Sequence, residues 1–177
     1  MTDAKEYGKA LFMLASECGN VSKVAEDVKI ARSVISTNPD YVRILNTPAL
    51  SKDERVALAD RAFSALDESV LNLIKILTES HALQLFIGAS DEFLAEYDES
   101  RGILRVEAIS AVPLTDKQSH ALAQKLGKTL GKTAIITNTV DPSILGGLKL
   151  RYGSCQLDGS IKTRLDKFEE ALKNTVI

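Results

Sequence analysis

The spacing of apolar residues changes from helical to strand-like within residues 101–108, Arg101-Gly102-Ile103-Leu104-Arg105-Val106-Glu107-Ala108. Before this stretch, apolar residues recur with the 3.6-residue period of helices. Within it, apolar and charged residues alternate with the two-residue period of a half-buried strand. We therefore predict an α+β fold, with an all-helical six-helix bundle over residues 1–102 and a small α/β domain over residues 103–177.

Upstream of this stretch, the clearest helix is the second one. Val21, Val24, Val28, Ala31 and Ile35 follow the i, i+3, i+4 spacing of a single buried helix face. The other predicted helices are the first one, which Gly19 ends, a short one at 41–45, one opened by the capping box at 51–54, one opened by the acidic pair 67–68, and one at 86–97.

Downstream, helix and strand signals alternate. A second capping box, Thr115-Asp116-Lys117-Gln118, opens a helix that Gly131 ends. Strands are predicted at 133–140, 148–152 and 155–157. Ser160 is predicted to cap a last helix, whose apolar face carries Ile161, Leu165, Phe168 and Leu172.

Composition excludes several classes of protein. The chain has 177 residues, 45% hydrophobic and 26% charged, with a formal net charge of −2. This is globular usage, and the small acidic excess disfavours nucleic acid as a partner. The N-terminus lacks the pattern of a signal peptide, and the longest apolar run, Ala10 to Ala15, has six residues, against the roughly 20 of a membrane span. The short apolar runs lead us to expect no direct membrane insertion. Two distant cysteines, Cys18 and Cys155, favour neither a disulfide scaffold nor a metal site, so we expect a reducing compartment.

Catalytic motifs are weak. Two Gly-Lys-Thr segments, at 127–129 and 131–133, suggest a phosphate loop, but neither has the required earlier glycine and both lie where a helix ends. A small nucleotide-binding enzyme using these segments is nevertheless the alternative hypothesis, and RNA binding by the second domain is a third. His81 and His120 each stand beside a serine, and adjacent helical residues point about 100° apart. We predict no catalytic, cofactor-binding or metal-binding residue, and therefore no enzyme.

Two helices carry more apolar surface than one core requires. In the fifth helix, the apolar residues between Val70 and Leu77 cover roughly 220° of the circumference, against the roughly 100° of an ordinary surface helix. In the first helix, apolar residues from Tyr7 to Ala15 leave an equally narrow polar edge. Two interpretations stay open: both helices are central and covered all round, or they form a groove that receives an amphipathic partner helix.

Four segments carry a family resemblance. Residues 140–153, Val140-Asp141-Pro142-Ser143-Ile144-Leu145-Gly146-Gly147-Leu148-Lys149-Leu150-Arg151-Tyr152-Gly153, resemble the C-terminal signature of the F-type ATP synthase delta subunit family, whose mitochondrial equivalent is the oligomycin-sensitivity-conferring protein. The segment from Leu157 to Leu165, with Asp158-Gly159-Ser160, looks like the helix start that follows in this family. Tyr7 to Phe12 is similar to its N-terminal "YAKAL" helix, and Ser110 to Thr115 to its "SA-x-PLT" link.

The resemblance implies a non-catalytic stator subunit without a cofactor. In this family the N-terminal bundle grips an N-terminal segment of an alpha subunit of the catalytic head, with the beta subunits as a further potential contact, and the C-terminal domain holds the b subunits of the peripheral stalk. Such a protein is peripheral, on the cytoplasmic side of a bacterial inner membrane or the matrix or stromal side of an organelle membrane. The resemblance places these residues on or beside the alpha-subunit face: Tyr7, Ala10, Leu11, Leu14, Leu73, Ile76 and Leu77.

The remaining signature residues are interpreted as structural. Asp141, Pro142, Gly146 and Gly147 are expected to shape the approach to a strand, and Asp158, Gly159 and Ser160 a turn with a helix cap.

Two positions depart from the family pattern. Gly8 replaces a common alanine, which is expected to weaken the first helix by up to about 1 kcal/mol. Glu79-Ser80-His81-Ala82 replaces the usual "ENGR" segment, which puts in doubt any contact made there by that arginine.

Overall fold

The structure is a computed structural model that describes residues 4–47, 50–144, 146–153 and 155–159. The chain divides into two compact units, Met1–Tyr97 and Asp98–Ile177. Over the described residues it contains seven helices and one four-stranded sheet, so the mixed helix-and-sheet class is as predicted. The predicted helix after Ser160 lies outside the described residues.

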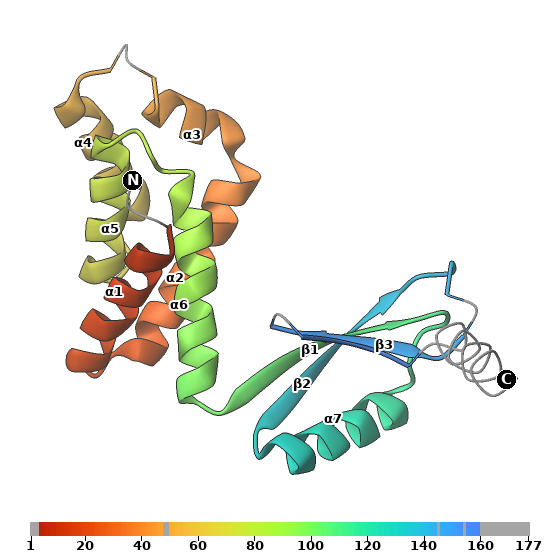
Figure 1. The fold of residues 1–177 in the computed structure, drawn as a ribbon. Coiled ribbons are helices and arrows are strands. Elements are labelled where there is room, and N and C mark those ends of the chain that lie inside the picture. The colour runs from red at the N-terminus through yellow and green to blue at the C-terminus, as the bar shows by residue number, and fades with distance from the viewer. Residues whose placement is uncertain (1–3, 48–49, 145, 154, 160–177) are drawn as a thin grey trace, which may run out of the picture. The chain divides into compact units, whose positions relative to one another are not determined.

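The first unit is helical (Figure 1). Its helices are α1 (Ala4–Glu17), α2 (Val21–Thr37), α3 (Pro39–Leu45), α4 (Lys52–Phe63), α5 (Glu68–Glu79) and α6 (Leu85–Ser100), the last of which continues past the division between the units.

Local chemistry sets several of these helix ends. The Ser51 hydroxyl accepts a hydrogen bond from the Glu54 backbone N–H at 3.3 Å, and the Glu54 carboxylate accepts one from the Ser51 backbone N–H at 2.9 Å. This reciprocal capping box starts α4, as predicted. The Ser51 hydroxyl also donates to the Glu54 carboxylate at 2.7 Å, and this bond and the backbone one lower the pKa of Glu54. Pro39 occupies the first turn of α3, where the missing N–H has no helical partner to lose.

The core of the first unit is one continuous cluster of hydrophobic residues. Helix α5 contributes Val70, Leu73, Ile74 and Leu77, all buried, and α1 packs against it. The largest fully buried side chains are aromatic and aliphatic ones from α3, α5, α6 and the α5–α6 loop: Phe86, Phe93, Leu45, Ile74, Leu77 and Leu83.

Gly8 lies where α1 passes close to α6. A Cβ atom at this position would lie 2.4 Å from the carbonyl oxygen of Ala89 and 2.7 Å from Cβ of Glu92. Phe12, one turn further along α1, meets the ring of Phe93 edge-on at a centroid distance of 5.9 Å. The glycine that costs helix propensity therefore permits tight packing of two helices, which propensity alone does not reveal.

His81 adopts a backbone conformation that glycine normally supplies. Its φ is +54°, in the left-handed region, directly after α5 ends. The Nδ1 atom of its ring lies 3.2 Å from the carbonyl oxygen of Asn46, which ties the end of α5 to the end of α3. His81 thus occupies the third position of the family's "ENGR" segment, in a strained backbone conformation and with its side chain in contact with Asn46.

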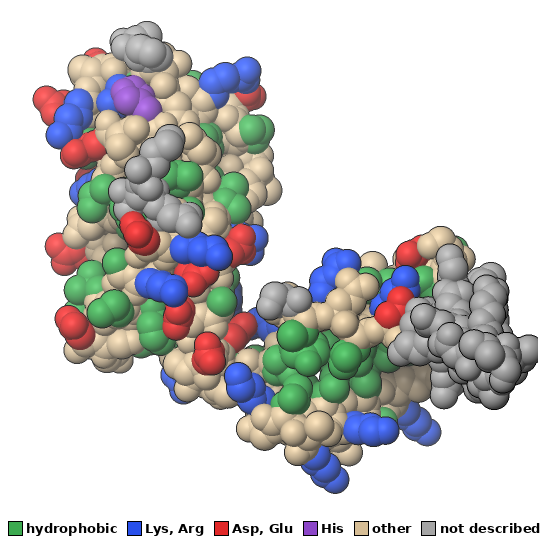
Figure 2. Space-filling model, viewed as in Figure 1, with side chains coloured by type: hydrophobic (Ala, Val, Ile, Leu, Met, Phe, Trp, Pro, Cys, Tyr) green, Lys and Arg blue, Asp and Glu red, His purple; other side chains and the backbone are tan. Residues whose placement is uncertain are grey.

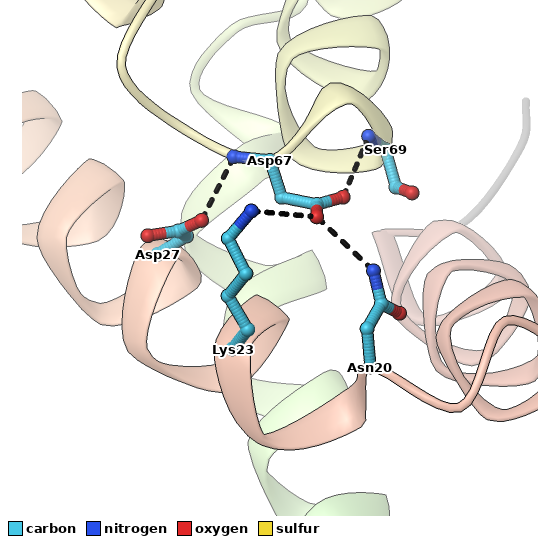
Figure 3. A network of polar contacts seen from close by, with 5 residues as sticks. All are labelled: Asn20, Lys23, Asp27, Asp67 and Ser69. Atoms are coloured by element: carbon cyan, nitrogen blue, oxygen red, sulfur yellow. Dashed lines mark hydrogen bonds and ion pairs between the residues drawn. The ribbon is translucent and has the colours of Figure 1, made fainter.

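A polar network holds the start of α5 against α2 (Figure 3). The Asp67 carboxylate caps α5 by accepting from the Ser69 N–H at 3.1 Å, accepts from the side-chain amide of Asn20 at 3.0 Å, and lies 3.5 Å from the ammonium of Lys23. The Asp67 backbone N–H donates to the Asp27 carboxylate at 2.8 Å. Desolvation raises the pKa of Asp67, but the hydrogen bonds from Ser69 and Lys23 and the Lys23 charge outweigh it, so the pKa is lowered.

The second unit is built on a sheet. Its elements are β1 (Ile103–Ser110), α7 (Asp116–Leu130), β2 (Thr133–Val140), β3 (Leu148–Tyr152) and β4 (Cys155–Asp158), and the strand order is β2-β1-β3-β4. Strands β1 and β2 are parallel and are joined by the crossover helix α7, whereas β3 is antiparallel to both β1 and β4. The predicted capping box at Thr115 and the glycine stop at Gly131, with φ +65°, bound α7.

Helix α7 packs on one face of this sheet, and the hydrophobic core between helix and sheet is shallow. The even-numbered residues of β1 on this face include Val106 and Ala108, which are buried. By contrast, none of the residues of α7 is buried, and its apolar stripe of Leu122 and Leu126 is only partly covered.

Candidate functional site

Exposed apolar side chains of the first unit gather on one flank of α1. Contacts to α6 come from Gly8, Lys9 and Phe12, so these residues define the α6 side of the helix. At 100° per residue, Tyr7, Ala10 and Leu14 lie on the opposite flank. Because α1 also packs against α5, this flank lies on the α5 side.

Helix α5 presents Ile76 in the same way. The ammonium of Lys75 pairs with the carboxylate of Asp60, which marks the α4 side of α5. Ile76 lies 100° round the helix from Lys75, away from α4, and therefore on the flank that adjoins α1. We define the α1/α5 face as Tyr7, Ala10, Leu14 and Ile76. Figure 2 shows hydrophobic side chains (green) over this part of the first unit, where α1 and α5 lie in Figure 1.

The seven sequence-predicted residues divide into two layers. Leu14 is 45% exposed and Ile76 is 52% exposed, Ala10 is also exposed, and Tyr7 is partly buried against the core. The other three, Leu11, Leu73 and Leu77, are buried beneath the face as members of the core. They support the face from below and present little or no surface to a partner.

The apolar excess is largely covered on α5 and stays exposed on α1. Most of the wide arc of α5 is covered by neighbouring helices, which is what a central helix requires. On α1 the excess stays exposed: Met13 is 63% exposed and lies 60° round the helix from Ala10. The site residues chosen from the sequence omitted Met13, although a helical wheel centred on buried Leu11 and Ala15 places it opposite the core.

The signature of the second unit shapes a turn. The Asp141 carboxylate accepts from the Ser143 backbone N–H at 2.9 Å, and hydrogen bonds from the side chain and the backbone of Ser143 lower the pKa of Asp141. Gly146 and Gly147 have φ values of +149° and +91°, which favour glycine, and Ile144 between the two ends of the turn is buried. These residues arrange the backbone before β3.

The turn after β4 is fastened to β3. The Gly159 N–H donates to the Leu148 carbonyl at 3.0 Å, and the carboxylate of Asp158 pairs with Lys149 at 3.4 Å. Ser160, predicted to cap the following helix, lies outside the described residues.

The Gly-Lys-Thr segments do not form a phosphate loop. Gly127, Lys128 and Thr129 lie in the last turn of α7, and Gly131 is its C-cap. A phosphate loop follows a strand and opens a helix, whereas here a helix ends and strand β2 begins. The alternative hypothesis of a nucleotide-binding enzyme is therefore not favoured.

The described residues hold neither a cluster of metal ligands nor a helix that could span a membrane. No group of three or more His, Cys, Asp or Glu side chains there is arranged to hold a metal ion. Likewise, no helix in those ranges has the length and apolar character to cross a bilayer.

The geometry defines a class: a two-unit helix-and-sheet protein whose first unit exposes an apolar face. The sequence matches the profile of the family described as "ATP synthase delta (OSCP) subunit" over residues 4–172, so the chain belongs to this family. It is accordingly a delta-type subunit of F-type ATP synthase, a component of the peripheral stalk that takes part in ATP synthesis.

Individual relatives agree with the family match. ATP synthase subunit delta of Geobacillus sp. is 34% identical over 170 residues, which cover 96% of each chain. ATP synthase subunit delta of Anaeromyxobacter dehalogenans is 33% identical over 172 residues, again 96% of each. Among solved structures, a chain of the Toxoplasma gondii mitochondrial ATP synthase hexamer superimposes with a TM-score of 0.78 at 21% identity, covering 97% of this chain and 98% of that one, which shows a shared fold.

Proposed function

We propose that this chain is the non-catalytic stator joint between the catalytic head and the peripheral stalk. Residues 1–102 bind the head, through alpha subunits and with the beta subunits as a further contact, and residues 103–177 bind the b subunits. By keeping the head from turning with the rotor, the joint lets torque drive ATP synthesis.

One observation carries the proposal: the α1/α5 face is apolar, exposed and backed by a rigid core. Leu14 and Ile76 come from adjoining helices and rest on buried Leu11, Leu73 and Leu77. An amphipathic helix that buries its apolar stripe on such a surface gains roughly 25 cal/mol for each Å² of apolar area removed from water. A broad contact of this kind dissociates slowly, and slow dissociation is what a joint under torque needs.

The proposed location follows from these partners. A subunit held between the head and the b subunits is a peripheral membrane protein, on the cytoplasmic side of a bacterial inner membrane or the matrix or stromal side of an organelle membrane. We expect washing of membranes with low-salt buffer to release the chain together with the head and without detergent.

Calorimetry with a synthetic peptide tests the face. The N-terminal segment of the alpha subunit from the same cells should bind the full-length chain at 1:1. Ile76→Asp should weaken binding at least tenfold, or about 1.4 kcal/mol, because it sets a charge against an apolar contact. Ile30→Asp is the matched control: Ile30 on α2 is 53% exposed, about as much as Ile76, but lies outside the α1/α5 face. Equal binding by both variants would exclude this face.

A coupling measurement tests the mechanical role. In membranes carrying Ile76→Asp, ATP hydrolysis by the head should persist while ATP-driven proton pumping falls, since a head that turns with the rotor performs no pumping. Pumping and hydrolysis that remain in their wild-type ratio would rule out a stator role for this contact.

A further inference from the structure

The outer edge of β2 is open. In the order β2-β1-β3-β4, strand β2 stands at the edge and pairs only with β1 among the residues that the structure describes. All eight residues from Thr133 to Val140 are in register with β1, so the opposite side of the strand presents an equally long row of backbone groups. An edge of this kind is a template for another strand.

The hydrogen bonds at the two ends of β2 show which groups face outward. The Thr133 N–H donates to the Gly102 carbonyl at 2.7 Å, and the Asp141 N–H donates to the Ser110 carbonyl at 2.9 Å. Backbone groups of successive residues in a strand point to opposite sides, so the odd-numbered residues face β1. The outward N–H and C=O groups therefore belong to the even-numbered residues Ala134, Ile136, Asn138 and Val140.

This edge lacks the features that keep edge strands apart. Residues 133–140 contain no charged residue, proline or glycine, and six of the eight are β-branched: Thr133, Ile135, Ile136, Thr137, Thr139 and Val140. The charged residues of the sheet lie on the other strands, such as Glu107 on β1 and Arg151 on β3, which pair with each other at 3.4 Å. Charged side chains on an edge strand discourage the addition of another strand, and β2 has none.

A basic groove runs beside the start of this edge. The cavity between α7 and β2 has a volume of about 430 Å³, and its lining includes His120, Lys128, Lys132 and Ala134 but no acidic residue. Within the described ranges, no carboxylate lies within ion-pair distance of Lys128, and Lys132 reaches Glu99 only at 4.0 Å. Figure 2 shows Lys and Arg side chains (blue) along α7.

We propose that an extended, acidic segment of another ATP synthase subunit adds to β2 as a further strand of the sheet. Its backbone would pair with Ala134, Ile136 and Asn138, and its acidic side chains on the α7 side would lie against Lys128 and Lys132. The inference rests on the proposed function, since the partner is sought within the assembled enzyme.

The charge of the groove favours an acidic partner over a second copy of this chain. Two β2 strands paired antiparallel about a two-fold axis would bring two α7 helices to the same side of the joined sheet. In an in-register pair the start of each β2 would lie beside the end of the other, so the nearest acidic group that a second copy brings to the groove is the single carboxylate of Asp141, against Lys128 and Lys132. An acidic segment satisfies the backbone edge and neutralises the groove at once.

Residue-resolved amide hydrogen exchange tests the proposal without mutation. The amides of Ala134, Ile136 and Asn138 should exchange rapidly in the isolated chain and at least tenfold more slowly in ATP synthase purified from the same cells. The odd-numbered amides, which bond to β1, should be protected in both samples.

Each possible exchange result bears either on the strand addition or on the proposed function. Even-numbered amides that exchange equally fast in both samples would overturn the proposal. If they are already protected in the isolated chain, the edge is covered by this chain itself or, when light scattering gives a doubled mass, by a second copy, and either result also overturns it. A chain that fails to copurify with the enzyme contradicts the proposed function rather than the strand addition.

Two matched pairs of variants complete the test. The quantity measured for each variant is the salt concentration that releases the chain from the enzyme. Lys128→Glu should lower that concentration, whereas Lys125→Glu, the same change on α7 outside the groove lining, should not. Ile136→Pro removes one outward donor and should lower it, whereas Ile136→Val keeps the donor and should not. Equal release within both pairs would overturn strand addition at this edge.

Discussion

The helical unit and the sheet unit bury their apolar residues to very different extents. In the first unit, seventeen hydrophobic residues from α1 to α6 form one buried cluster. In the described part of the second unit, the buried hydrophobic residues are Val106, Ala108 and Ile144, the buried polar ones are Asp98 and Ser110, and α7 contributes none. A unit with a complete core can expose one apolar face without losing its shape, whereas a unit with a shallow core depends more on what binds to its surfaces.

Truncating one core side chain in each unit should give the largest contrast. Phe93→Ala removes a fully buried ring and should destabilise the first unit by about 3–5 kcal/mol, whereas Leu126→Ala removes a partly covered side chain and should cost the second unit about 1–2 kcal/mol. Urea titration followed by hydrogen exchange of peptides from each unit measures both. Equal losses would mean that the sheet unit is as tightly packed as the helical one.

Adding a methyl group at a helical glycine in each unit sharpens the same contrast. A Cβ at position 8 would meet three atoms of α6 at 2.4–3.0 Å, whereas one at position 127 would meet a single close atom, the Lys132 carbonyl oxygen, at 2.8 Å. We expect Gly8→Ala to destabilise the chain by about 1–3 kcal/mol, although alanine is the better helix former, and Gly127→Ala to cost less. Stabilisation by Gly8→Ala in the same titration would show that α1 and α6 separate easily.

Removing a helix cap from each unit should have a smaller effect. Asp67→Ala should cost about 1–2 kcal/mol, because Asp67 also binds Asn20 and Lys23, and Thr115→Ala, at an exposed cap, about 0.5–1 kcal/mol. Because folding lowers the pKa of Asp67, its contribution is fully present above the unfolded value near 4 and is lost as the pH falls through the folded value.

Denaturation at pH 7 and pH 3 checks the sign of this dependence. The difference between wild type and Asp67→Ala should shrink at pH 3, while that for Thr115→Ala, which removes a hydroxyl that does not titrate, should not. A difference that grows in acid would contradict the assignment of Asp67 as a stabilising carboxylate.

Exchanging residues at two left-handed positions should have the smallest effect. His81 and Gly131 have φ values of +54° and +65°, each just after a helix. We expect His81→Gly to stabilise the chain by less than about 1 kcal/mol, since relief of strain is offset by the lost contact with Asn46, and Gly131→Ala to destabilise it by about 1 kcal/mol. Thermal melts resolve shifts of this size, and a loss of stability in His81→Gly would mean that the contact with Asn46 outweighs the strain.

Local signals in the sequence predicted most of the elements. Both capping boxes, the stop at Gly131 and the alternation in β1 were correct, because each depends on interactions within a few residues. Tertiary contacts could not be predicted in this way: the reason for Gly8 is the backbone of α6, more than eighty positions away, and the tie between Asp67 and Asn20 joins two helices. At the candidate site, periodicity singled out the first and fifth helices for their wide apolar arcs but could not separate buried Leu77 from exposed Ile76, which depends on how the neighbouring helices pack.

The first unit is formed entirely from the leading part of the chain, and this has a consequence for synthesis. Its buried cluster is drawn from residues Leu11 to Phe93, and no later strand is required to complete it. The 80 residues that follow Tyr97 take roughly 4–16 s to translate at 5–20 residues per second. Leu14 and Ile76 can therefore be in place on a folded surface while the ribosome is still making the sheet, so the apolar face exists before the second unit does.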